Sequence, residues 1–133
     1  MYELLIKAHF DAAHSLRGYP GDCAGLHGHT WRVEVVIEGE ELNDIELLYD
    51  FRELKSQVDE VLSKFDHKYL NEVHPFDELS PTGENLARYL FEQLKATFPD
   101  GINLKKVSVW ESEDACISYK ESHGSRTRAR DED

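Results

Sequence analysis

Three histidines in the first quarter of the chain have the spacing of metal ligands. His27 and His29 are separated by one residue, so both imidazoles project from the same side of the chain if the segment is extended. His14 ends an earlier alternating segment, and a hairpin between the two segments can bring it beside the pair. Three neutral imidazoles leave one tetrahedral position open, which is the arrangement of a catalytic zinc ion. The spacing therefore favours a zinc site over three unrelated loop histidines.

A cysteine lies close to this proposed site. Cys23 stands four residues before His27, in a glycine-rich segment, 17–25, that we expect to be a loop. A thiol beside a divalent cation has a lowered pKa, and the thiolate could then remove a proton from a substrate held on the metal. The residue could equally be a fourth ligand that closes the site, or an inert loop thiol. Its type and spacing leave these three roles open.

Two acidic positions further along the chain could also carry chemistry. Asp66 and His67 are adjacent, so the carboxylate can orient the imidazole, although two solvated loop residues would give the same pattern. Glu111 ends an apolar segment, where its carboxylate could accept the paired N–H donors of an aminopyrimidine or simply be exposed. Neither position decides the function on its own.

The apolar periodicity predicts the elements that must position these residues. Strands are expected at 2–10, 30–39, 104–111 and 115–121. Two amphipathic helices are expected between them, one capped by Asp50 over 51–65 and one that opens at Ser80 and Pro81 and ends at 98. The segment between the helices, 66–79, is expected to be a loop, which could contain a helical turn. The order ββααββ predicts an α+β domain, with a four-stranded antiparallel sheet and both helices on one face.

Length and composition narrow the function classes. The 133 residues, 40% of them apolar, suffice for one domain, which we place at 1–121 with a disordered tail at 122–133. The net charge of -12 argues against binding to nucleic acid or anionic lipid. Two cysteines are too few for a disulfide scaffold and no apolar window is long enough to span a membrane, so we expect a cytoplasmic protein. The unpaired sheet edges predict a homo-oligomer.

Taken together, five motifs resemble the 6-pyruvoyl-tetrahydropterin synthase family. They are Phe10-x-Ala12-Ala13-His14, Cys23-x-x-x-His27-Gly28-His29, Asp66-His67-x-Tyr69-Leu70-Asn71, Pro81-Thr82-x-Glu84-Asn85 and Glu111. They follow the family's order from Leu4 to about Lys120. They look most like those of the bacterial branch, the 6-carboxy-5,6,7,8-tetrahydropterin synthases.

The resemblance implies a fold, an assembly and roles for the motif residues. The fold is the T-fold, whose subunits join as a trimer into a barrel, and two trimers stack as a hexamer. The zinc ligands would be His14, His27 and His29, and Cys23 would accept the proton. The proton relay would be His67, supported by Asp66. Glu111 would anchor the pterin and also take part in the relay. Thr82 and Glu84 would lie near the substrate pocket, although Ser80 or Thr82 could simply be the N-cap of the second helix.

The resemblance also implies a reaction. It is the zinc-dependent conversion of 7,8-dihydroneopterin triphosphate to 6-carboxy-5,6,7,8-tetrahydropterin, with release of acetaldehyde and triphosphate, in queuosine biosynthesis. A 6-pyruvoyl-tetrahydropterin synthase, which keeps the carbon chain, and a non-catalytic zinc-binding oligomer closed by Cys23 are the alternatives. A triphosphate on an acidic protein also needs local cations. The candidates are Lys7, Arg17, Lys68, Lys105 and Lys106.

Overall fold

The two alternating segments near the N-terminus form one long hairpin. The computed structural model of the chain describes residues 1–17 and 27–121, with the backbone alone for His27. Strand β1 (Tyr2–His14) pairs antiparallel with β2 (His27–Gly39) along its whole length. The predicted hairpin is thus confirmed, but both strands are longer than expected, because the burial alternation of β1 continues through Ala12 to His14. The proposed metal ligands therefore lie within the strands.

Three further strands complete a five-stranded sheet. Strand β4 (Asn103–Trp110) pairs antiparallel with β2, and β5 (Cys116–Tyr119) pairs antiparallel with β4. Strand β3 (Lys68–Tyr69) runs parallel to the end of β1, which gives the order β3-β1-β2-β4-β5. The prediction of four strands missed β3, since two residues are too few to show an alternation. A 3-10 helix, η2 (Leu70–Glu72), follows β3 in the segment expected to be a loop.

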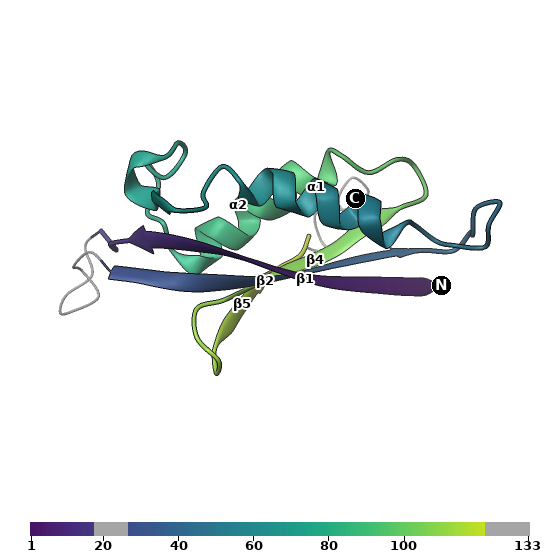
Figure 1. Ribbon diagram of the computed structural model, residues 1–133, viewed down its shortest axis with the longest axis horizontal. Helices are drawn as coiled ribbons and strands as arrows, with labels where there is room; N and C mark the ends of the chain where they lie inside the picture. Colours follow the sequence, from purple (N-terminus) through teal and green to yellow (C-terminus); the bar gives the residue numbers. More distant parts are fainter. Residues whose placement is uncertain (18–26, 122–133) are drawn as a thin grey trace, which may run out of the picture.

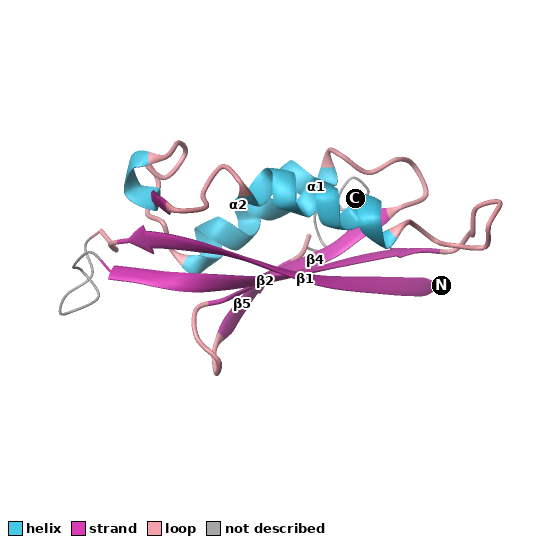
Figure 2. Cartoon of the chain, viewed as in Figure 1, coloured by secondary structure: helices cyan, strands magenta, loops and turns pink. Residues whose placement is uncertain are grey.

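Helices α1 (Phe51–Leu62) and α2 (Gly83–Lys95) cover one face of the sheet (Figures 1 and 2). Asp50 caps α1 as predicted, its carboxylate accepting a hydrogen bond from the backbone N–H of Arg52. Of the two candidate caps of α2, Ser80 and Thr82, the structure uses Thr82, so the helix begins two residues after the expected opening at Ser80 and Pro81. Side chains from both helices and from β1, β2 and β4 form one buried core between the layers.

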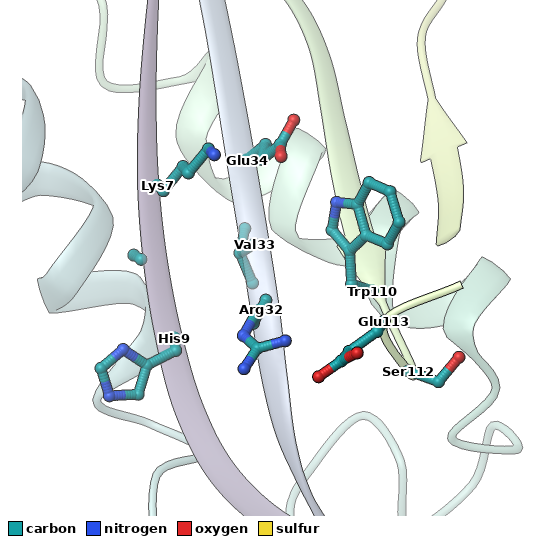
Figure 3. A pocket seen from close by; sticks show the side chains of 9 residues that line it. Lys7, His9, Arg32, Val33, Glu34, Trp110, Ser112 and Glu113 are labelled. Atoms are coloured by element: carbon teal, nitrogen blue, oxygen red, sulfur yellow. The ribbon is translucent and has the colours of Figure 1, made fainter. Parts of the chain in front are cut away.

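The opposite face of the sheet is not covered by any helix of the described residues (Figure 2). Alternation turns polar side chains of β1 and β2 to this face, and they line a cavity of about 460 Å³ with residues around the end of β4 (Figure 3). Its polar lining residues include Lys7, His9, Arg32 and Glu113. We call the two sides the helix face and the outer face. Among the described segments, no helix has the length and apolar character needed to cross a membrane.

Candidate metal and acid-base site

His14 and His29 meet on the helix face of the hairpin. The register pairs His14 with His27 and Ala12 with His29, which makes His14 and His29 diagonal neighbours. Their Nε2 atoms lie 2.9 Å apart, and the side chain of His14 is buried. The hairpin therefore brings together two of the three histidines predicted from the sequence. The side chain of His27 lies outside the described residues.

The loop before α2 determines which ring nitrogen of His14 carries the hydrogen. Nδ1 of His14 lies 2.8 Å from the carbonyl oxygen of Pro81. A carbonyl can only accept a hydrogen bond, so Nδ1 carries the hydrogen and the neutral ring keeps its lone pair on Nε2. That lone pair points at His29. Orientation of a histidine through its second ring nitrogen is typical of metal ligands in proteins.

Trp31 supports both histidine rings from the core side. The ring centroids of Trp31 and His14 are 4.9 Å apart, those of Trp31 and His29 are 4.8 Å apart, and both contacts are edge-on. Trp31 is fully buried between the sheet and the helices. The indole thus limits the rotation of the two imidazoles and keeps one side of the group dry.

Glu111 joins the two histidines from β4. It directly follows that strand and continues the core-facing positions of Val107 and Val109. One ligand atom each from His14, His29 and Glu111 lies within 4.8 Å of the others. Two imidazole nitrogens and a carboxylate oxygen are donors that zinc accepts in tetrahedral sites. The donor set present on this face therefore fits a divalent metal such as zinc.

Asp66 and His67 form a second group, beside β1. Nδ1 of His67 lies 3.2 Å from Oδ1 of Asp66, and the same Oδ1 accepts a 2.9 Å hydrogen bond from the backbone N–H of Asp11. The N–H of His67 in turn donates to the carbonyl oxygen of Asp11. His67 adopts a left-handed backbone (φ 60), a conformation that costs energy in a non-glycine residue and that recurs at functional sites.

The electrostatics of Asp66 favour its ionised form. The hydrogen bond from the backbone N–H of Asp11 is the main reason why the pKa of this carboxyl lies below its usual value. The neighbouring His67 lowers the pKa further, while partial desolvation opposes both effects. Asp66 is therefore a carboxylate at neutral pH, able to accept the Nδ1 hydrogen of His67.

The two groups lie on opposite faces of the sheet. Along β1 the buried residues are Phe10, Ala12 and His14, so the side chain of Asp11 projects to the outer face. The carboxylate of Asp11 lies within 4.8 Å of the ligand atoms of Asp66 and His67. Asp11 and His67 border a cavity of about 660 Å³, whose other lining residues are Ala12, Ala13, Gly28, His29, Thr30, Lys68 and Tyr69. Most of its lining thus comes from the outer face and from β3.

The Thr82 and Glu84 motif does more for the fold than for direct contact with the histidines. The hydroxyl of Thr82 accepts the N–H of Asn85 as the helix cap, and Glu84 is an exposed residue of the first turn. Gly83 between them is needed for close packing. A Cβ added there would stand 2.5 Å from Cδ1 of Ile117 and 3.5 Å from Oε1 of Glu111. Sequence reasoning missed Gly83 and Pro81 as parts of the site, although both lie inside the quoted motif.

The structure shows which candidate cations are engaged by other groups and which border a cavity. The guanidinium of Arg17 donates to the backbone carbonyl oxygens of Leu79 and Phe76, at 2.6 and 2.8 Å, and so ties the chain near the hairpin to the loop before α2. Lys105 forms an ion pair with Glu3. Lys68 borders the cavity beside His67, and Lys7 borders the outer-face cavity. Cys23 lies outside the described residues.

Comparisons with known proteins agree with this architecture. The family model described as 6-pyruvoyl tetrahydropterin synthase matches residues 3–122. A dihydroneopterin monophosphate aldolase of Pyrococcus furiosus is 37% identical over 81% of this chain and 88% of its own. A 6-carboxy-5,6,7,8-tetrahydropterin synthase of Haemophilus influenzae is 27% identical over 91% of this chain and 100% of its own. The solved 6-pyruvoyl tetrahydropterin synthase of Caenorhabditis elegans superposes with a TM-score of 0.80 at 30% identity, over 91% of this chain and 96% of that one.

Proposed function

Since the chain belongs to the 6-pyruvoyl tetrahydropterin synthase family, we propose that it is a zinc-dependent lyase that makes 6-carboxy-5,6,7,8-tetrahydropterin from 7,8-dihydroneopterin triphosphate. Acetaldehyde and triphosphate would leave, and the pathway would be that to queuosine. The observation that carries the proposal is the approach of the His14 and His29 Nε2 atoms to 2.9 Å, with His14 oriented by Pro81.

The residues of the chain divide the work of the reaction. When bound, zinc would polarise the side-chain oxygens of the pterin and so acidify the adjacent C–H bonds. Its ligands would be His14 and His29, with His27 as the third. Cys23 would take the proton from the substrate side chain, as a thiolate base.

The acidic residues would handle the pterin ring and the remaining protons. Glu111 would accept the N–H donors of the aminopyrimidine edge through its two carboxylate oxygens. His67, held by the ionised Asp66, would pass protons as the leaving group departs. Thr82 and Glu84 would line the substrate pocket at the start of α2.

The proposed assembly is a hexamer built from two trimeric barrels. Within the described residues, β3 pairs with β1 only at Ala12 and Ala13, so the rest of this edge of β1 is open to another strand. The other edge of the sheet is β5, which pairs with β4 on one side. Joining these two edges between copies would satisfy both sets of backbone groups and close a barrel.

A dihydroneopterin monophosphate aldolase is the second candidate. The relative from Pyrococcus furiosus carries that name, and a monophosphate needs fewer cations than a triphosphate. Among the described residues, Arg17 is engaged by carbonyl oxygens and Lys105 by Glu3, and the segment 18–26 contains no lysine or arginine. Of the five candidate cations, Lys68 is the one that borders the cavity lined by His29 and His67. So few cations near the histidines favour the smaller anion.

Product analysis separates the candidates. The zinc-loaded protein would be incubated with dihydroneopterin triphosphate or monophosphate, and the pterin products identified by mass. Acetaldehyde formed in step with triphosphate supports the 6-carboxy reaction. A pterin that keeps its three side-chain carbons identifies a pyruvoyl synthase, and cleavage of the monophosphate alone identifies the aldolase. The absence of turnover with both substrates would leave a non-catalytic zinc protein.

A further inference from the structure

The carboxylate of Glu111 faces the same point as the two histidine Nε2 atoms. Its ligand atom lies within 4.8 Å of those of His14 and His29. We propose that Glu111 is itself a ligand of the metal while no substrate is bound, in addition to its role at the pterin. The inference rests on the metal centre of the proposed function and adds a residue to its resting state.

The position of Glu111 is built into the packing of three elements. Strand β4 lies next to β2, which carries His29, and the core-facing side of β4 leads to Glu111. The backbone N–H of Glu111 donates to the carbonyl oxygen of Ala115 at 3.1 Å and fixes the start of the turn between β4 and β5. Oε1 of Glu111 lies against the start of α2, 3.5 Å from where a Cβ at Gly83 would stand. The carboxylate therefore lies between the end of β4 and the start of α2, on the side of the sheet that carries His14 and His29.

The charge balance of the group favours an acidic ligand. Neutral imidazoles leave both positive charges of a divalent ion uncompensated, and the Trp31 side of the group is buried. A carboxylate from Glu111 supplies one negative charge at that place. A bidentate pair with the N–H donors of a pterin needs both oxygens of the carboxylate. Metal ligation by Glu111 and pterin binding therefore compete.

Metal binding without substrate tests the inference. Co²⁺ would be titrated into the metal-free full-length protein, and its visible absorption and its affinity in competition with a chelator would be measured. Glu111→Gln, which keeps the size of the side chain, should weaken Co²⁺ binding about 10-fold or more and change the absorption bands. Glu113→Gln is the matched control, because Glu113 lies in the same turn but lines the outer-face cavity with Lys7 and Arg32 (Figure 3).

A second measurement uses the competition. Both Co²⁺-loaded proteins would be saturated with 7,8-dihydroneopterin. The absorption bands of the wild type should change more than those of Glu111→Gln, because only in the wild type does the pterin displace a carboxylate ligand while its own oxygens reach the metal. Far-ultraviolet circular dichroism would verify folding, and Glu111→Asp, which keeps the charge, would replace a variant that fails to fold.

Equal Co²⁺ affinities and spectra for wild type and Glu111→Gln would overturn the inference and leave the metal centre standing. If the wild type itself bound no Co²⁺ or Zn²⁺, the metal centre and the inference would both be wrong. Loss of turnover in Glu111→Gln is expected from its role at the pterin, so activity is not the readout.

Discussion

Nδ1 of His14 donates its hydrogen to the carbonyl oxygen of Pro81, across 67 positions of sequence. The contact joins the end of β1 to the loop that starts α2 and turns the lone pair of Nε2 toward His29. The geometry of the histidine group thus depends on a backbone carbonyl as well as on the histidines themselves.

Loss of one of these histidines should release the metal. We expect about one zinc ion per chain in the wild type and little in His29→Ala or His14→Ala, because the remaining ligands hold the ion weakly. Zinc per chain can be measured by atomic emission after gel filtration. The control is His9→Ala, on the outer face of β1, which should keep its zinc. Full occupancy in both ligand variants would remove the histidine pair from the metal site.

Replacement of Cys23 distinguishes its two proposed roles, general base and fourth metal ligand. If Cys23 is the general base, its removal should lower turnover by about 100-fold or more, because proton transfer contributes factors of this size. The zinc ion and the oligomer should persist. Cys23→Ala would be compared with Cys116→Ala, which changes the exposed cysteine of β5. A Cys23→Ala protein that lost its zinc together with its activity would instead support the closed, non-catalytic site.

Asp66 should give the fold a pH-dependent contribution. Its pKa is lower in the folded chain than in the unfolded one, so the ionised carboxylate stabilises the fold above the unfolded value, near pH 4. That contribution disappears as the pH falls through the folded pKa. Asp66→Asn should therefore be less stable than wild type at neutral pH, and the difference should shrink in acid.

Urea unfolding at a series of pH values measures this difference. Asp100→Asn, which removes an exposed carboxylate in the turn after α2, is the control for the loss of one negative charge. A stability difference that is constant from neutral pH to about pH 3 would contradict the assigned role of the Asp11 N–H.

The local pattern was enough to predict the hairpin and the helices. The pairing of the two alternating segments is confirmed along their length, and the alternation places His29 on the same face as Trp31. Asp50 caps α1 because its side chain needs only a neighbouring N–H. Contacts of this kind join residues that are close in the sequence, so they can be predicted from the local pattern.

The approach of Glu111 to the histidines could not be predicted in this way. It depends on the order of the strands, since β4 must lie beside β2. The choice between Ser80 and Thr82 as the cap of α2 could not be predicted for a related reason. Ser80 and Pro81 have the residue types of a helix start, but the Pro81 carbonyl is bonded to His14 and the Ser80 carbonyl to the side chain of Asn85, leaving Thr82 as the cap. Long-range hydrogen bonds thus decided between two plausible local signals.

The separation of the two groups predicts that a complete site needs two chains. His29 points to the helix face with His14, whereas His67 gathers with Asp11, whose side chain is on the outer face. In one chain both His29 and His67 border the same open cavity, but the two groups gather around different faces of β1. If a substrate must touch both groups, the His67 group has to come from a neighbouring copy, which the open edges of β1 and β5 would hold in place.

Mixed oligomers test this arrangement directly. His29→Ala and His67→Ala should each be inactive alone, and their co-expressed mixture should recover activity in about a quarter of the sites, the fraction in which both contributing chains are intact at the relevant residue. The matched control is a mixture of His29→Ala and His14→Ala, whose lesions lie in the same histidine group, and it should stay inactive. Turnover by oligomers purified through two different tags provides the measurement. A His29→Ala and His67→Ala mixture as inactive as the control would mean that each chain completes its site alone, across the cavity that His29 and His67 both border.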